Sequence, residues 1–498
     1  TDHRAEPFTC LTPLPGMVLA MNPNWPCLAF AAALDEGAEG FRMSPTALHG
    51  LWGQVPWGLL SPRDRREQDA EPPLRGAADR GNVAVLTQEI TLAAEGSSVF
   101  TYLTGLARQP EEIESLLSRY RQQGVRALLH QVQAFWSAEL SLLTCHVPSE
   151  ELALALNSYL PYQVRVARLW ARAGLYQAGG AIGFRDQLQD AVNLLLLDSK
   201  PAREQIGCAC AHQFAAGDVC HWWHAGFGVE HGVRTRISDD LLWLPWAVCE
   251  YAQKTGDTQI LSAEYPFLAG EELEENEHDR YQPLTPGAET GTVLEHCRRA
   301  FMRVLARGVG AHGLLHIGTG DWNDAFDRVG AQGRGESVWL TWFFAVTARK
   351  FAALIGGHAA EQLTLAADRC TRAAEAAWDG AWYRRGYYDD GQPLGSEKSG
   401  ECRIDAIAQA FAAFDTHADP VHVQRALTSA VEQLFDREHN VVRLFDPPIT
   451  RRTPETGYVR SYGAGLRENG GQYTHGALWL AMALLRTGRT DEGAQILR

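Results

Sequence analysis

From about residue 147 onward, the sequence is a succession of apolar and amphipathic stretches of helical length, and this succession constrains the fold more than any other feature. Clear examples are RDQLQDAVNLLLLD, AREQIGCACAHQF, TVLEHCRRAFMRVLARG and GESVWLTWFFAVTARKFAALIG. Their apolar residues recur at helical spacing, and the connecting stretches are rich in Gly, Trp, Asp and Arg. No repeat recurs at a fixed short period, which argues against a solenoid. Paired helices joined by long loops predict a mainly α fold, an (α/α)6 toroid barrel over residues 148–498 whose loops form a pocket at one end.

Residues 1–107 differ in character, because they are rich in Pro and Gly and contain the β-like segments NVAVLTQEITLA and SSVFTYLTGLA. We expect a partial β-sandwich domain there. Residues 108–147 are an amphipathic stretch in which acidic residues come first and basic residues later. This order suits the helix dipole and predicts a helical linker.

Composition and charge exclude two classes of protein. The formal net charge of -15 argues against general nucleic-acid binding, which needs a positive field to replace counterions. No apolar run reaches the length needed to cross a bilayer, so we expect a soluble protein without a membrane segment. The ten cysteines are scattered, which favours reduced thiols in a cytoplasmic enzyme over a disulfide framework.

The two ends of the chain suggest part of a longer polypeptide. The first residues, TDHRAEPFTC, have neither an initiating Met nor the apolar region of a signal peptide. The last residues, RTDEGAQILR, stop inside what is predicted to be a helix. We therefore expect the barrel to be truncated at its C-terminal end.

Four loop stretches share one composition of Arg, Asp, Glu, His, Trp and Gly. They are GGAIGFRDQLQD (179–190), CHWWHAGFGVEHGVRTRISDD (220–240), GTGDWND (318–324) and GLRENGGQYTH (465–475). Each stretch precedes or opens a predicted helix. A fold that gathers them would combine carboxylates, guanidinium groups, an imidazole and indoles, which suits a polyhydroxylated ring bound beside an anion.

Each stretch also has a purely structural interpretation. Ser238 and Asp239 suit helix N-caps, and Asp321 could cap a helix that places Asp324 one turn onward. Arg185 and Asp190 lie five residues apart and could each belong to a surface ion pair. The letters HWWH could suggest a metal pair, but no second spaced Cys/His group lies nearby, so we predict a wall of the pocket and no metal.

Taken in order, GFRDQLQD, HWWH, RTRISDDLLWLP, GTGDWND, GESVWL and RENGGQYTH resemble glycoside hydrolase family 94, the inverting β-glucoside phosphorylases, over roughly residues 150–498. The wording GGAIGFRDQLQD with CHWWH is most similar to the branch of phosphorylase-like domains in cyclic β-1,2-glucan synthases. The resemblance implies a β-sandwich, a helical linker and an (α/α)6 barrel. It also implies a β-glucan oligosaccharide and inorganic phosphate as substrates, no further cofactor, and a homodimer as one possible assembly.

The resemblance carries residue roles by motif position. Asp324, the last residue of DWND, matches the general acid. The predicted substrate-binding residues are Arg172, Arg185, Asp190, Trp322, Glu468 and Gln472. The predicted phosphate-binding residues are Arg185, Arg236 and His475, and Arg234 is a further candidate for holding the anion. The family pattern continues past QYTH to a Thr-Gly that helps hold phosphate, and this chain ends first.

A single carboxylic acid suffices for phosphorolysis. An inverting hydrolase needs an acid and a base roughly 6.5–9.5 Å apart, the base activating water. Phosphate already carries its nucleophilic charge, so the second position should hold Arg, His and backbone N–H groups. The prediction is inverting phosphorolysis of a β-linked glucoside to α-glucose 1-phosphate, with Asp324 protonated near Trp322. The alternatives are an inverting β-glucan hydrolase with Glu468 as base and a non-catalytic glucan-binding fragment.

Overall fold

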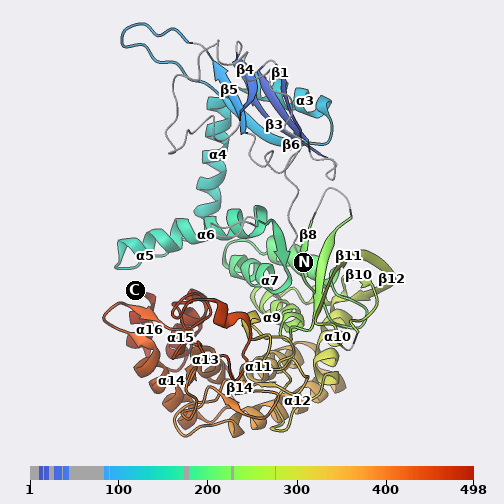
Figure 1. Cartoon of the computed structure of the whole chain (residues 1–498), viewed down its shortest axis with the longest axis vertical. Helices are drawn as coiled ribbons and strands as arrows, with labels where there is room; N and C mark the ends of the chain where they lie inside the picture. The colour runs from blue at the N-terminus through green and yellow to red at the C-terminus, as the bar shows by residue number, and fades with distance from the viewer. Residues whose placement is uncertain are drawn as a thin grey trace. The chain divides into compact units, whose positions relative to one another are not determined.

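The computed structural model forms two compact units, Thr1–Glu139 and Leu140–Arg498, which are described separately (Figure 1). It describes residues 10–14, 16–21, 27–35, 38–43, 83–88, 90–172, 179–225, 229–274 and 276–498. Residues 1–9 and 44–82 of the predicted sandwich domain therefore lie outside the described residues.

The first unit contains an antiparallel sheet and a separate strand pair. The sheet has the order β1-β2-β3-β6, and its strands are Cys10–Leu14, Met17–Met21, Leu28–Ala33 and Tyr102–Ala107. Strands β4 (Ala38–Met43) and β5 (Val83–Gln88) pair antiparallel. The predicted β segments thus correspond to β5 and β6, whereas the partial β-sandwich over residues 1–107 stays a prediction.

Two helices follow the sheet. Helix α3 (Pro110–Gln123) begins with Pro in its first turn and buries Ile113 and Leu117 beside Phe30 of β3. Gly124 follows with φ +73°, a conformation that favours glycine, and α4 (Val125–Leu140) begins at the next residue. Residues 110–140 of the predicted linker are therefore helical apart from the interruption at Gly124, and residues 141–147 are not helical.

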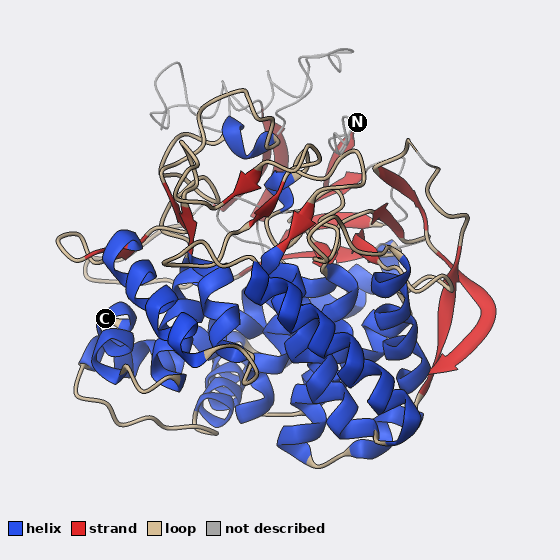
Figure 2. Cartoon of the chain, turned by 90° about the horizontal axis from the view of Figure 1, so that it is seen from below, coloured by secondary structure: helices blue, strands red, loops and turns tan. Residues whose placement is uncertain are grey.

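Two layers of helices form the main body of the second unit, which also contains short sheets such as the four-stranded one of order β11-β9-β8-β7 (Asp279–Pro283, His231–Thr235, Cys220–His224 and Ala181–Gly183). One layer contains α7 (Phe184–Asn193), α9 (Trp243–Thr255), α11 (Val338–Ile355), α13 (Ala406–Phe414) and α15 (Thr474–Arg486), and each contacts the next in chain order. The other contains α8 (Lys200–Cys210), α10 (Val293–Ala306), α12 (Gly357–Ala376), α14 (Pro420–Leu434) and α16 (Thr490–Leu497), each packed on its predecessor in the chain. Figure 2 shows these helices side by side. The mainly α class is confirmed, and the two layers are consistent with the predicted toroid, whose six-pair count stays a prediction.

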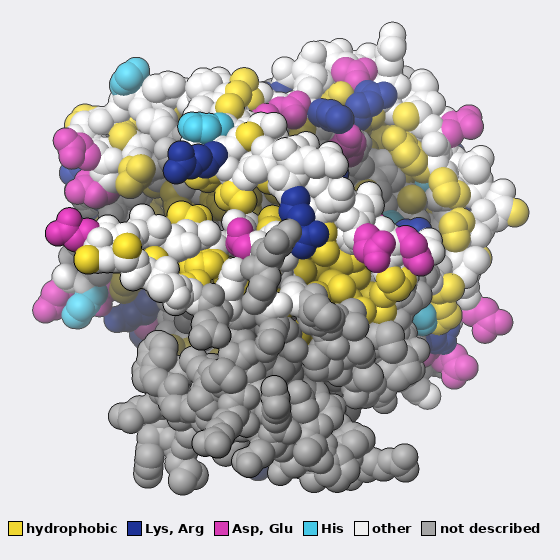
Figure 3. Space-filling view, turned by 90° about the horizontal axis from the view of Figure 1, so that it is seen from above, with side chains coloured by type: hydrophobic (Ala, Val, Ile, Leu, Met, Phe, Trp, Pro, Cys, Tyr) yellow, Lys and Arg dark blue, Asp and Glu magenta, His cyan; other side chains and the backbone are white. Residues whose placement is uncertain are grey.

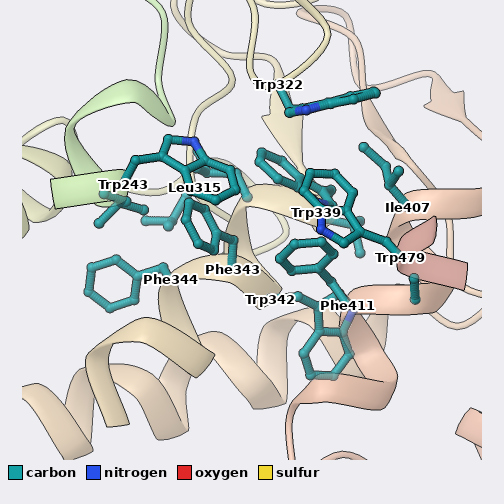
Figure 4. Packing of buried hydrophobic residues seen from close by; sticks show 14 of the residues in the cluster. Trp243, Leu315, Trp322, Trp339, Trp342, Phe343, Phe344, Ile407, Phe411 and Trp479 are labelled. Carbon is teal, nitrogen blue, oxygen red and sulfur yellow. The ribbon is translucent and has the colours of Figure 1, made fainter. Parts of the chain in front are cut away.

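The core of this unit is built from aromatic rings of the first layer (Figure 4). Trp243 of α9 lies 4.5 Å from Phe343 of α11, and Phe411 of α13 lies 4.8 Å from Trp479 of α15, measured between ring centroids. Complete burial of such a ring stabilises the fold by roughly 1.5–3 kcal/mol. Trp322, from the DWND loop, lies 5.3 Å from Trp479 and is buried with them. The core therefore anchors the loop that carries the predicted acid.

Helix α11 corrects one expectation. Among the residues that the structure describes, it alone is long and apolar enough to cross a bilayer by length and composition, although no such run was expected. Two thirds of it is buried inside the unit (67%), as in the core helix of a globular domain. Its Arg349 pairs with Asp368 and Asp415 of the same unit.

On the face seen in Figure 3, basic, acidic and hydrophobic side chains are interspersed.

Candidate active site

The four loops predicted to gather lie together around the N-terminal ends of the first helix layer. Arg185 is in the first turn of α7 and His475 in the first turn of α15. The Ser238 hydroxyl donates to the carbonyl of Gly320 at 3.0 Å, which joins the loop before α9 to the GTGDWND loop. Trp322 joins that loop to His475. The layered helices thus bring together residues separated by more than a hundred positions in the chain.

Arg185 is the centre of the site. Its Nη2 donates to Oδ1 of Asp324 at 2.8 Å, and its Nη1 donates to both carboxylate oxygens of Asp239 at 3.2 and 3.3 Å. Nη1 also donates to the carbonyl of Asp321 at 3.2 Å. The side chain of Arg185 is 10% exposed. A buried cation with such partners remains charged, because Asp324, Asp239 and Asp240 together hold the pKa of Arg185 well above its ordinary value despite burial.

Asp324 lies between two cationic groups and keeps partial access to solvent. Its Oδ2 is 3.7 Å from Nε2 of His221, and 31% of the side chain is exposed. Burial raises the pKa of Asp324 above its ordinary value, although Arg185 and His221 act in the opposite direction. A carboxyl group of this kind can hold a proton at a higher pH than a solvated aspartate, as a proton donor requires.

Asp321, three residues earlier, has a different role. Its two carboxylate oxygens each accept a hydrogen bond from Arg385 at 2.6 Å, and Oδ2 also accepts one from the Ser337 hydroxyl at 2.6 Å. Arg385 is fully buried, and its Nε lies 3.4 Å from Asp405. This network holds the loop and leaves Asp324 as the partly exposed acid of DWND.

The two capping predictions were wrong. Asn323, not Asp321, caps the short helix η8 (Asp324–Phe326) by accepting from the backbone N–H of Ala325. Asp239 precedes a 3-10 turn but makes no capping bond. Its carboxylate instead accepts from Arg185 and from the indole N–H of Trp243. Asp239 is buried, and a buried carboxylate needs hydrogen-bond partners of this kind.

Trp322 of the DWND loop and His475 contact each other directly. The indole Nε1 of Trp322 donates to Nδ1 of His475 at 3.3 Å. Burial and then Arg185 lower the pKa of His475 to about 4, so the imidazole is neutral at pH 7.

Two predicted sugar-binding residues, Arg172 and Asp190, lie before α7 and in its second half, respectively. Arg168 donates through Nε to Asp190 at 2.8 Å, and burial raises the pKa of Asp190 to about 6. Arg172, at φ +50°, donates to the carbonyl of Gly180 at 3.0 Å and so braces the loop before α7. The Arg185 and Asp190 side chains thus contact different partners, as their five-residue spacing allowed.

The loop before α15 provides a second carboxylate. Glu468 lies 3.3 Å from Arg467. Burial and the charge of Glu468 raise the pKa of Tyr473, and burial, Asp324 and Glu468 raise the pKa of Tyr458. The exposed Gln472 accepts from the backbone N–H of Val442, which holds its side chain on the neighbouring strand.

Two arginines expected to bind the anion have other partners. Arg234 is 1% exposed and donates to both oxygens of Asp218 at 2.6 and 2.7 Å, so it is a structural residue. Arg236 donates to the carbonyls of Glu277, Leu273 and Glu274 at 2.8, 3.2 and 2.6 Å. Arg185 and His475 are thus the predicted anion-binding residues that the structure places by the DWND loop.

Sequence reasoning missed His221 and Asp240. Nδ1 of His221 donates to Oδ2 of Asp240 at 2.8 Å, which leaves Nε2 towards Asp324. Burial opposes the charge, but Asp240 outweighs it and the pKa of His221 rises to about 9. The signal was present in CHWWH and ISDD, which we interpreted as a pocket wall and a cap. Trp223 of CHWWH is in fact core, stacked on His212 at 3.8 Å.

No group of three or more potential metal ligands occurs among the described side chains. The arrangement provides one partly exposed acid beside a guanidinium, a cationic imidazole and a neutral imidazole. Groups of these types bind anions and polarise hydroxyl groups.

The model of the Glycosyl hydrolase 94 superfamily catalytic domain matches residues 135–498, and the chain belongs to this family.

Three proteins are similar to this chain over most of its length. The cyclic beta-(1,2)-glucan synthase NdvB of Rhizobium meliloti (strain 1021) is 41% identical over 97% of this chain and 17% of its own length. The 3-O-beta-D-glucopyranosyl-beta-D-glucuronide phosphorylase of Paenibacillus borealis is 28% identical over 85% of this chain and 52% of its own. The cellobionic acid phosphorylase of Neurospora crassa is 25% identical over 92% and 55%. The chain therefore spans about half, or much less, of the length of these relatives.

Proposed function

We propose that this chain catalyses the inverting phosphorolysis of a β-linked glucan, releasing α-glucose 1-phosphate and a shortened sugar. The observation that carries the proposal is the position of Asp324, a partly exposed carboxyl group with a raised pKa, 2.8 Å from the buried guanidinium of Arg185. Membership of a family whose relatives include phosphorylases supports the same reaction.

In the forward direction Asp324 is the general acid. Protonated Asp324 donates to the glycosidic oxygen as the bond to the anomeric carbon breaks. Phosphate attacks that carbon from the opposite face, so the configuration inverts and the leaving sugar departs as an alcohol. In the reverse direction the Asp324 carboxylate accepts the proton of the acceptor hydroxyl, and glucose 1-phosphate releases phosphate.

Arg185 links the binding of the anion to the protonation state of Asp324. Without substrate its Nη2 donates to Asp324, which favours the carboxylate. When a glucosyl ring and a phosphate accept the hydrogen bonds of Nη2, Asp324 loses its own hydrogen bond to Arg185. The pKa of Asp324 then rises further, and the proton is present when the nucleophile is bound. Asp239 keeps Arg185 in place through Nη1 during this exchange.

The proposed substrate is a β-1,2-linked glucan with glucose at its non-reducing end. Support comes from the relative that matches almost the whole chain, whose name specifies a β-(1,2)-glucan. Asp190, Arg172, Glu468 and Gln472 are the proposed sugar-binding residues, and His475 joins Arg185 on the phosphate. Arg236 joins them only if its bonds to carbonyls of 273–277 are released.

One observation supports a second reaction. Burial and the charges of Asp324 and Glu468 raise the pKa of Tyr458, so both carboxyl groups lie near this side chain. An inverting hydrolase would use Glu468 to activate water and Asp324 as the acid.

Phosphate dependence separates the reactions. The chain would be incubated with β-1,2-glucan oligosaccharides, with and without phosphate, and the products identified by proton NMR. We expect α-glucose 1-phosphate only with phosphate. Equal release of free sugar in both incubations, initially in the α configuration that inversion produces, would support hydrolysis. Calorimetric binding of the glucan with no product at any phosphate concentration would identify a non-catalytic glucan-binding chain.

A further inference from the structure

The contact between Trp322 and His475 determines which nitrogen of the imidazole carries a proton. An indole N–H can only donate, so the nitrogen that accepts it has a free lone pair. Trp322 donates to Nδ1 of His475 at 3.3 Å. The proton of a neutral His475 must therefore be on Nε2.

The packing around both rings keeps this contact in place. Trp322 is 7% exposed, and its ring lies 5.3 Å from Trp479 and 5.2 Å, edge to face, from Tyr473. The His475 ring lies 4.0 Å from Trp479, one turn further along α15. Figure 4 shows Trp322 and Trp479 in the same aromatic cluster. The buried Trp322 ring cannot turn away without opening the core, and the contact with Trp479 holds the His475 ring beside it.

The charges around His475 also favour the neutral ring. Arg185 and Asp186 at the start of α7 act on it in opposite senses, and Arg168, from the preceding helical segment, adds to the effect of Arg185. Tyr473 and Trp479, on its own segment, are uncharged at pH 7. Two guanidinium groups against one carboxylate disfavour a second charge on the ring.

We propose that Trp322 is a positioning residue that holds His475 as the neutral Nε2–H tautomer, a single hydrogen-bond donor for a phosphate oxygen. The assignment of phosphate as the ligand rests on the proposed function. A neutral donor binds the anion without adding a third cation near Asp324, where Arg185 and His221 already favour the carboxylate. The contact thereby helps to keep Asp324 able to hold its proton.

The tautomer can be measured directly in the whole chain. Histidine labelled with nitrogen-15 would be observed by long-range nitrogen–proton NMR from pH 5 to 8, and the His475 signals assigned by their loss in His475→Asn. We expect a protonated Nε2 and an unprotonated Nδ1 throughout this range. A cationic ring at pH 7, or a proton on Nδ1, would overturn the inference. This readout decides the tautomer whether or not the chain forms glucose 1-phosphate.

Two matched variants test the role of the indole N–H. Trp322→Phe keeps an aromatic ring but removes the donor. Trp339→Phe, also buried beside Trp479, removes an indole N–H that has no hydrogen-bond partner. We expect Trp322→Phe to give mixed His475 tautomers and a KM or Kd for inorganic phosphate raised about 3- to 10-fold, the usual effect of one neutral hydrogen bond. Trp339→Phe should leave both unchanged. Equal effects of the two variants on tautomer and phosphate affinity would show that only packing matters.

Discussion

Replacing Asp324 by Asn removes the transferable proton but keeps an amide oxygen that can accept the 2.8 Å hydrogen bond from Arg185. Arg185 would retain Asp239 at 3.2 Å and Asp240 at 3.9 Å, so its charge stays compensated and the fold should persist. General acid catalysis contributes roughly a 100- to 10,000-fold rate increase. We therefore expect kcat of phosphorolysis to fall by that factor, equivalent to about 3–5 kcal/mol in the barrier, with the sugar KM changed less than about threefold.

The assay is the initial rate of glucose 1-phosphate release at saturating phosphate, repeated with a dinitrophenyl β-glucoside. Such a leaving group departs without protonation, so the variant should lose less than about tenfold on that substrate. Asp327→Asn is the control in the same loop. Its oxygen can still accept from the backbone N–H of Tyr458, so its rate should change little. Equal losses of Asp324→Asn on both substrates, or a parallel loss of sugar binding, would refute the role of Asp324 as acid.

Three further predictions concern groups around the acid. Because the pKa of His221 is raised to about 9, its protonated form should stabilise the fold fully below pH 6.5, and this stabilisation should be lost as pH rises through about 9. In urea titrations, the difference in unfolding free energy between the wild type and His221→Asn should shrink by of order 3 kcal/mol across that window. Arg385→Met leaves Asp321 and Asp405 buried without their cation and should destabilise the chain by roughly 3–5 kcal/mol, and Arg385→Lys should destabilise it less. Equal unfolding midpoints of the wild type and Arg385→Met would show that these ion pairs do not stabilise the fold. Glu468→Gln should keep kcat of phosphorolysis within about tenfold while weakening sugar binding; abolished release of free sugar without phosphate would instead identify a water-activating base.

The sequence by itself determined the class of fold and the family. The helical stretches were predictable because their apolar periodicity is a local property that packing in two layers then satisfies. The four loop motifs were recognisable because their order and composition survive without knowledge of their positions in space. The family match over residues 135–498 confirms that recognition.

Only the tertiary structure decided which ion-pair partner each of several similar residues has. Asp321 and Asp324 differ in sequence by three positions, yet one is buried against Arg385 and the other faces Arg185. Arg234 and Arg185 are equally basic in sequence, but Arg234 is held by Asp218. These pairings join segments far apart in the chain.

The same reason explains why His221 was missed. Its importance depends on the approach of Asp240 on one side and Asp324, from a distant loop, on the other. Burial and charge act through space, so they raise or lower a pKa only after the helix layers have brought the loops together. A sequence pattern identifies the groups available for chemistry, whereas the packing of the helices determines which of them can hold a proton or bind an anion.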